Sequence, residues 1–226
     1  FVSANPTGPM HVGHCRGAVF GDVLSNLLIF NGGKVTKDFY INDYGNQIHN
    51  FVKSVYLRIR EIKFKENFPE DKELYNGEYI KDISIEVLKK IKNHDFNSFE
   101  KSFDVLKKES LNYSLNLIKT DLKLLGVKHD NFFSETQMVK KKSVDKAINI
   151  LKKNKFVFEG YLQPPKGEEN SSWKKTKRLI FKSSSFGDDA DRALQKDDGT
   201  WTYFANDIGY HSTKINKKYD SLINIL

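Results

Sequence analysis

Two histidines near the start of the chain, His11 and His14, have the side-chain type and the spacing to bind an anion. They stand three residues apart where a turn rich in Pro and Gly gives way to an amphipathic run that predicts a helix. Both rings therefore look out from the positive end of that helix, where unpaired backbone N–H groups favour negative charge. Gly13 lets a flat group approach the backbone closely, so a triphosphate-bearing ligand would fit here.

Other interpretations of the two histidines have to be weighed. Half of a metal site is one, but the usual helical zinc pair is spaced by four residues with a carboxylate, and the chain has a single cysteine, Cys15. We therefore predict no metal site. Ordinary surface or core histidines are the other interpretation. The rigid Pro-Thr-Gly-Pro run before them argues against it, because such a turn is a costly arrangement for packing alone.

A second set of candidate residues, Tyr203, Asp207 and His211, is spaced i, i+4, i+8. These residues share one face if Thr200 or Thr202 caps a helix after the Asp-Asp-Gly hairpin turn at residues 197–199. A carboxylate beside a phenol suits a guanidinium, which donates parallel N–H bonds to both. An ordinary amphipathic helix explains the same spacing, and the residues alone do not decide between the two. That alternative would bury Phe204 and Ile208.

A strand, a helix and a second strand are needed to position the pair His11 and His14. We expect strand geometry at Phe1 and Val2, a helix from His14 to about Asn31, and a parallel strand over residues 34–41. Val19, Val23, Leu27 and Phe30 are predicted to form one apolar stripe of that helix. Gly13, Gly17 and Gly21 are predicted to form a flat groove that packs on the sheet, with its first turn facing a ligand. Loops at the carboxyl ends of such strands form ligand sites, which places residues 5–14 and 42–47 together. Asn42 or Asp43 is expected to cap the following helix.

The middle of the chain predicts mainly helices. Short ones are expected within the Lys- and Glu-rich residues 62–97, and a long one from Ser98 to Gly126. Its inward residues would be Leu111, Leu115, Ile118, Leu122 and Leu125. A further helix over residues 136–154 carries a lysine-rich face that we interpret as solvated, and residues 179–181 predict a strand. Trp173 is interpreted as an edge-strand aromatic, with base stacking as the alternative.

Composition limits the class of protein. The 226 residues are 38% hydrophobic and 29% charged, and no run approaches the roughly 20 apolar residues of a membrane span. No membrane association is therefore expected. The single cysteine fits a reducing cytoplasm. A net charge of +8 suits a polyanion such as tRNA, although solvated lysines explain it equally well. The chain begins without Met inside an apolar run, and we expect it to be a fragment.

Three stretches together resemble one family. The run F-V-S-A-N-P-T-G-P-M-H-V-G-H-C-R-G-A is similar to the arginyl-tRNA synthetases, and its H-V-G-H resembles the H-I-G-H signature of class I aminoacyl-tRNA synthetases. Residues 41–47, I-N-D-Y-G-N-Q, match a second motif of that family. Residues 187–211 resemble its D-D-x-D-R and D-G-T-x-T-Y-F-A-x-D-I-x-Y-H block. The match covers residues 1–50 and 187–226, whereas the middle agrees only in pattern.

The resemblance implies a Rossmann-like α/β nucleotide-binding fold with a parallel sheet, interrupted by a mainly helical insertion. The expected divisions are residues 1–61, the insertion at 62–186, and a return to the nucleotide fold at 187–226. It also implies roles for residues. His11 and His14 would be catalytic and, with Pro9 and Gly13, would bind ATP. Asn5, Tyr203 and Asp207 would bind arginine. Further motif residues are Asn42, Asp43, Asn46, Gln47, Asp191, Arg192 and His211.

The implied reaction joins arginine to the 3′ end of arginine tRNA through an arginyl-adenylate, with ATP as substrate and Mg²⁺ as cofactor. A cytoplasmic enzyme is expected, and a monomer, although the sequence leaves the oligomeric state open. The K-M-S-K loop and the anticodon-binding domain of the family are not within these residues, so the chain alone should be inactive. Another class I synthetase, a small-metabolite nucleotidyltransferase and a noncatalytic tRNA-binding protein remain open alternatives.

Overall fold

The computed structural model describes residues 1–162 and 176–225, which form two compact units. The first unit holds Phe1–Thr136 with Asn224 and Ile225, and the second holds Gln137–Ile223. Trp173 lies outside the described residues, and the divisions expected at residues 61 and 186 stay a prediction. In the described part of the chain, no helix is both long and apolar enough to cross a membrane.

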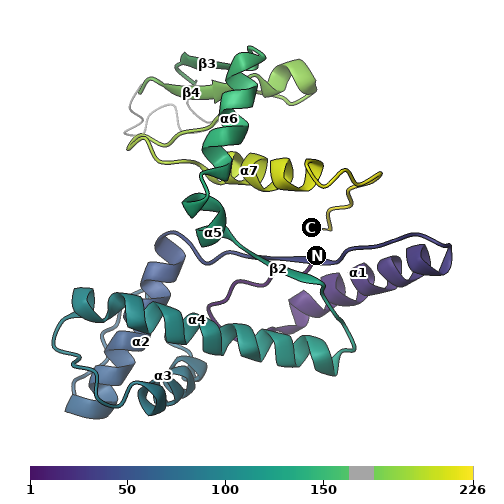
Figure 1. Cartoon of the computed structure of the whole chain (residues 1–226). Helices are drawn as coiled ribbons and strands as arrows, with labels where there is room; N and C mark the ends of the chain where they lie inside the picture. Colours follow the sequence, from purple (N-terminus) through teal and green to yellow (C-terminus); the bar gives the residue numbers. More distant parts are fainter. Residues whose placement is uncertain (163–175, 226) are drawn as a thin grey trace. The chain divides into compact units, whose positions relative to one another are not determined.

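The first unit contains a parallel pair of short strands joined by helices (Figure 1). Its elements are α1 (Val12–Phe30), β1 (Asp38–Ile41), α2 (Asn46–Phe64), α3 (Glu78–Lys90), α4 (Phe99–Leu124) and β2 (Asn131–Ser134). Asp38 lies opposite Asn131 and Ile41 opposite Ser134, so both strands end at the same edge. Mixed α/β structure with a parallel sheet is confirmed. The connection between its strands is α2–α4.

Helix α4 joins the two hydrophobic cores of the first unit. Leu106 and Leu111 pack with α2 and α3, whereas Ile118 and Leu122 pack around β1. The predicted limits of this helix are confirmed by local chemistry. At its start the Ser98 hydroxyl accepts a hydrogen bond from the Lys101 N–H, and it ends before Gly126, whose φ is +76°. Leu125 is 41% exposed, so its predicted inward position is wrong.

The expected strand at residues 1–2 is wrong. Val2 and Ser3 have φ angles of 68° and 47°, which are incompatible with extended backbone. The segment still lies beside β1, because the Phe1 nitrogen donates to the Asp38 carbonyl and the Tyr40 N–H donates to Ser3 Oγ, both at 3.0 Å. The predicted strand at residues 34–41 is shorter than expected and covers only Asp38–Ile41.

Helix α1 buries the side that carries Gly21, which belongs to the predicted glycine groove. The residues of the predicted apolar stripe are all exposed, namely Val19, Val23, Leu27 and Phe30. The buried residues are the small ones, Ala18, Gly21 and Ser25. A Cβ at Gly21 would lie only 2.3 Å from the Phe1 ring, which shows how closely this side of α1 approaches the N-terminal segment. Close approach of the backbone therefore decided which face is buried, and hydrophobicity did not.

The second unit combines two helices with an antiparallel sheet. Its elements are α6 (Ser143–Lys153), β3 (Val157–Gly160), β4 (Arg178–Phe181), η1 (Ser183–Phe186), β5 (Arg192–Ala193) and α7 (Tyr203–Ile215), and α5 (Glu135–Lys140) leads into it. The sheet order is β3-β4-β5. The single helix expected over 136–154 is wrong, because Lys142 has a φ of 52° and separates α5 from α6. The strand predicted at 179–181 is confirmed as β4.

Gly209 permits α7 to pack tightly on α6. A Cβ there would lie 2.8 Å from Val144 Cγ2 and 3.0 Å from Val144 Cα, and the backbone atom has little freedom to move. Gly209→Ala should lower the free energy of unfolding by about 1–3 kcal/mol. Gly17→Ala in α1 is the matched control: its Cβ would meet nothing within 4 Å, so a gain of up to about 1 kcal/mol is expected. Equal effects in chemical denaturation would contradict this account.

His129 packs among Phe1, Phe39 and Phe132 and should make stability depend on pH. Burial lowers the pKa of its ring to about 4, with smaller effects from neighbouring charges. Between pH 6.5 and about 4, His129 binds a proton in the unfolded chain but stays unprotonated in the folded chain. The free energy of unfolding therefore falls as the pH falls through this window. Allowing for partial exposure, the loss should be about 1–2 kcal/mol.

His129→Leu should remove that part of the pH dependence. Urea unfolding of wild type and variant at about pH 7 and about pH 4.5 measures it. If both proteins lose the same free energy between the two pH values, the burial of His129 is not the cause.

Candidate functional site

The two histidines cap the start of α1 reciprocally. His11 is the N-cap residue, and its Nδ1 accepts a hydrogen bond from the Gly13 N–H at 3.1 Å. In return, His14 Nδ1 accepts from the His11 N–H at 3.2 Å. The two rings stack with centroids 3.7 Å apart. The predicted pairing of His11 and His14 at a helix N-terminus is thus present, with a capping role for each ring that the sequence did not indicate.

These hydrogen bonds determine the tautomer of both rings. A ring nitrogen that accepts a hydrogen bond carries no proton, so the proton of each ring is on Nε2. Desolvation and the neighbouring His11 lower the pKa of His14, which favours its neutral form. Each ring therefore directs an Nε2–H donor away from the helix backbone. Two such donors near the positive end of the helix dipole suit phosphate oxygens.

Gly13 makes this arrangement possible. A Cβ at this position would lie 2.9 Å from His11 Cε1 and 3.0 Å from His11 Nδ1. Any other residue would push the His11 ring off the helix start and break the bond between Nδ1 and the Gly13 N–H. The sequence predicted close approach of a flat group at Gly13, and the group that the structure places there is the ring of His11.

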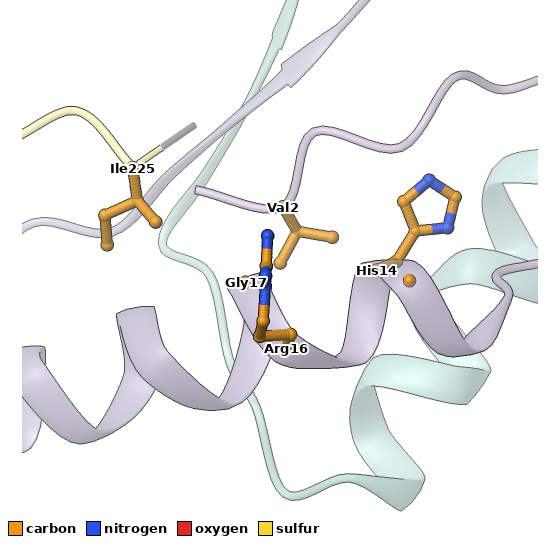
Figure 2. A pocket seen from close by; sticks show the side chains of 6 residues that line it. Val2, His14, Arg16, Gly17 and Ile225 are labelled. Atoms are coloured by element: carbon orange, nitrogen blue, oxygen red, sulfur yellow. The ribbon is translucent and has the colours of Figure 1, made fainter.

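A hollow of about 210 Å³ lies beside His14 (Figure 2). It is lined by Val2, Gly13, His14, Arg16, Gly17 and Ile225. Arg16 and Gly17 were not among the predicted site residues. Their signal was in the sequence, because Gly17 follows His14 by three residues and so shares its helix face. Arg16 adds a cationic group to this hollow, which His14 also lines.

The loops predicted to meet at the carboxyl end of β1 do meet. Asn5 Nδ2 donates to Gln47 Oε1 at 3.2 Å, which joins the first loop to the second across 42 residues of sequence. Asn46 is exposed in the first turn of α2. Pro9 is also exposed, directly before Met10, whose N–H donates to Asp121 of α4.

The predicted cap of α2 is wrong. Gly45 is its N-cap residue and makes no side-chain cap, and its φ of +88° favours glycine. Asp43 instead reaches across to β2 and the start of α5, where it accepts hydrogen bonds from Ser134 and Thr136. Asn42 is partly buried, and its Oδ1 has no hydrogen-bond partner among the described residues.

In the second unit, Tyr203, Asp207 and His211 share one face of α7 as predicted. Thr202 is the cap, and its Oγ1 accepts from the Ala205 N–H at 3.3 Å. Tyr203 is 67% exposed. Desolvation raises the pKa of the Asp207 carboxyl, and the basic side chains of His211 and Lys214 have a smaller, opposite effect. An accessible phenol and a carboxylate with reduced hydration fit a cationic ligand.

His211 lies one turn beyond Asp207. Desolvation lowers the pKa of its ring, and Lys214 lowers it further, while Asp207 acts in the opposite direction. His211 is therefore a neutral ring at neutral pH and does not compete with a ligand as a cation for the Asp207 carboxylate.

The acidic residues before α7 form hydrogen bonds with Arg192 and Ser184. The Arg192 guanidinium donates to Asp188 at 2.6 and 2.8 Å and to Asp189 at 2.8 Å, and it holds the pKa of the Asp188 carboxyl well below its usual range. Asp191 Oδ1 accepts from Ser184 N and Oγ. Asp191 and Arg192 thus shape the loop around η1, and the structure shows no role for them beyond that.

In residues 1–162 and 176–225, no group of three or more His, Cys, Asp or Glu side chains lies close enough together to hold a metal ion.

The predicted site residues form two groups, and each group lies within one of the two units. His11, Gly13 and His14 meet in the first unit, where Asn5 and Gln47 also meet. Tyr203, Asp207 and His211 meet in the second unit.

Comparisons with known proteins show the family of the chain. Residues 1–226 match the family model described as "tRNA synthetases class I (R), catalytic domain". The chain is 55% identical over its whole length to the arginine–tRNA ligase of Pelagibacter ubique and 49% identical over 99% of its length to that of Wolbachia pipientis wMel. It spans about 39% of the length of these curated relatives.

Solved structures give the same result. A provisionally named arginyl-tRNA synthetase from Campylobacter jejuni aligns with 97% of this chain at a TM-score of 0.82 and 35% identity, over 44% of its own length. The Thermus thermophilus arginyl-tRNA synthetase, at 20% identity and a TM-score of 0.60, aligns with 93% of the chain over 34% of its own length and supports the fold alone. The chain therefore belongs to the catalytic-domain family of class I tRNA synthetases of the arginine type.

Proposed function

We propose that the full-length protein activates arginine with ATP and transfers it to arginine tRNA. The observation that carries the proposal is the stacked histidine pair at the start of α1, in which the backbone occupies both Nδ1 atoms. The Nε2–H groups are then oriented before any ligand binds. The family of the chain and the names of its relatives support arginine as the amino acid.

In this proposal the first unit binds ATP. His11 and His14 donate to the triphosphate, whose negative charge also meets the positive end of α1. The hollow beside Gly13 and Gly17 receives the remainder of the nucleotide, with Pro9 in the bend before the helix. Each preoriented donor that follows the developing charge is expected to lower the barrier by about 3 kcal/mol. Mg²⁺ would arrive on the phosphates of ATP and neutralise part of their charge.

The amino acid would be recognised through its guanidinium. Asp207 and Tyr203 of α7 would bind it, and Asn5 is assigned to arginine binding as well. The arginine carboxylate attacks the α-phosphorus, which forms arginyl-adenylate and releases pyrophosphate. A ribose hydroxyl of the terminal tRNA adenosine then attacks the arginyl carbonyl and releases AMP. No protein nucleophile takes part in either step. The protein would therefore accelerate the reaction by positioning the substrates and stabilising the charge that develops on the phosphates.

The proposal also includes the attraction of tRNA, the cellular location, the oligomeric state and the domain divisions of the protein. The net charge of +8 would favour approach of tRNA, and the enzyme would act in the cytoplasm as a monomer. Residues 1–61 and 187–226 would form the nucleotide fold around an insertion at 62–186. Charging of arginine tRNA by the full-length protein tests the function, with lysine as the competing cationic amino acid. Charging with arginine alone is expected, and charging with neither would contradict the proposal.

A further inference from the structure

Asp43 holds the carboxyl ends of both parallel strands together. Its Oδ2 accepts from Ser134 Oγ at 2.6 Å and its Oδ1 accepts from the Thr136 N–H at 2.7 Å. Its backbone carbonyl accepts from Thr136 Oγ1 at 2.9 Å. Three hydrogen bonds thus join residues more than 90 apart in the sequence. Both carboxylate oxygens are used, so the geometry of the side chain is fixed.

The register of the sheet explains why Asp43 can make these contacts. Ile41 lies opposite Ser134, so the chain leaves both strands at the same edge. After β1 it forms the loop that leads into α2. After β2 it enters α5, and the second unit begins at Gln137. Asp43 therefore fastens the first loop to the last residues of the first unit.

The loop that Asp43 fastens leads directly into the first turn of α2, which carries Gln47. Gln47 Oε1 accepts from Asn5 Nδ2 at 3.2 Å, and Asn5 is one of the residues assigned to arginine in the proposed function. If the loop shifts away from β2, Gln47 moves with it and Asn5 loses its partner. The position of Asn5 thus depends on a carboxylate that does not contact it.

From these contacts we infer that Asp43 is a positioning residue for arginine binding, acting through the loop at residues 42–47 and through Gln47 on Asn5. This inference rests on the proposed function. It predicts that hydrogen-bond geometry at position 43 is required and that its negative charge is not. Two substitutions separate these properties. Asp43→Ala removes every side-chain contact, whereas in Asp43→Asn Oδ1 still accepts from the Thr136 N–H and the amide can donate to Ser134 Oγ.

Steady-state ATP–pyrophosphate exchange of the full-length protein, with arginine and ATP varied separately, tests the inference. Asp43→Ala should raise the KM for arginine by about tenfold or more and change kcat and the KM for ATP by less than about threefold. Asp43→Asn should stay within about threefold of wild type in all three constants. An Asn variant as impaired as the Ala variant would overturn the inference, because the charge would then be required.

Asp130→Ala is the matched control. Asp130 Oδ2 accepts from the Lys37 N–H at 2.7 Å, which is a carboxylate contact at the opposite end of the same two strands. It should destabilise the protein without raising the KM for arginine. If Asp130→Ala and Asp43→Ala raise that KM equally, the effect is one of general stability and the inference is wrong.

Hydrogen–deuterium exchange gives a readout that does not need activity. Asp43→Ala should accelerate exchange in residues 42–47 and 134–140, whereas Asp130→Ala should leave both segments as in wild type. Unchanged exchange in Asp43→Ala would overturn the inference. If wild type shows no arginine-dependent activity, the proposed function fails, and these exchange rates still decide whether Asp43 holds the two segments.

Discussion

Asp207→Ala in the full-length protein is expected to lower kcat/KM for arginine by about 10²- to 10³-fold, mainly through KM. The carboxylate projects from α7 beside Tyr203, and desolvation raises its pKa, so it gains more from a guanidinium than a fully hydrated carboxylate would. The KM for ATP should be nearly unchanged, because the residues proposed for ATP lie in the other unit. Amino-acid-dependent ATP–pyrophosphate exchange measures kcat, the KM for arginine and the KM for ATP.

Two companion variants sharpen this prediction. Asp207→Asn keeps the shape and an acceptor but loses the charge, so an intermediate loss is expected. Asp220→Ala removes an exposed carboxylate just beyond α7 and controls for the change in net charge. If Asp220→Ala weakens arginine use as much as Asp207→Ala, a general electrostatic effect explains the loss. An unchanged KM for arginine in Asp207→Ala would place the guanidinium elsewhere.

His14→Ala is expected to lower kcat by about 10²- to 10³-fold. The substitution removes one Nε2–H donor and also the acceptor of the His11 N–H, so the remaining histidine loses part of its orientation. A helix start that loses a cap should cost about 1 kcal/mol of unfolding free energy as well. Single-turnover formation of the adenylate measures the chemical step, and chemical denaturation measures the cap.

The matched control for His14→Ala is Val12→Ala. Val12 lies between the two histidines and is 86% exposed, and no side-chain contact of it supports either ring. It should leave kcat within about twofold of wild type. A His14→Ala enzyme that loses stability but keeps its kcat would show that the histidine pair serves the helix and not the phosphates.

Local chemistry was readable from the sequence. The start of α4 at Ser98, its end at Gly126 and the Thr202 cap each depend on a few neighbouring residues, and all three are present in the structure. The face of α7 that holds Tyr203 and Asp207 follows from its cap and from helical spacing alone. These predictions, which need only one turn of chain, were correct.

The glycine spacing of α1 indicated its packing side, whereas its hydrophobic periodicity did not. The stripe with Val19 and Leu27 is exposed, and the structure buries the side with Ala18 and Gly21. Small side chains give a short distance between backbones, and a hydrophobic periodicity carries no information on that distance. The glycines spaced by four residues were the available signal.

Asp43 shows a second limit of prediction from the sequence. Its residue type and its place before a helix predict a cap, yet its carboxylate binds Ser134 and Thr136. That contact depends on the parallel register of two strands separated by three helices. Asn5 and Gln47 were predicted to meet from a rule about strand ends, and they do meet although residues 1–2 form no strand. The partner of Asp43 required knowledge of which strand lies next to β1.

The central claim, activation of arginine at the histidine pair of α1, is tested most directly by amino-acid-dependent ATP–pyrophosphate exchange. The full-length protein would be offered each amino acid in turn, with and without arginine tRNA. Exchange with arginine alone, lost in His14→Ala, is the predicted result. A folded protein that binds tRNA but exchanges pyrophosphate with no amino acid would contradict the claim and would favour a noncatalytic tRNA-binding role.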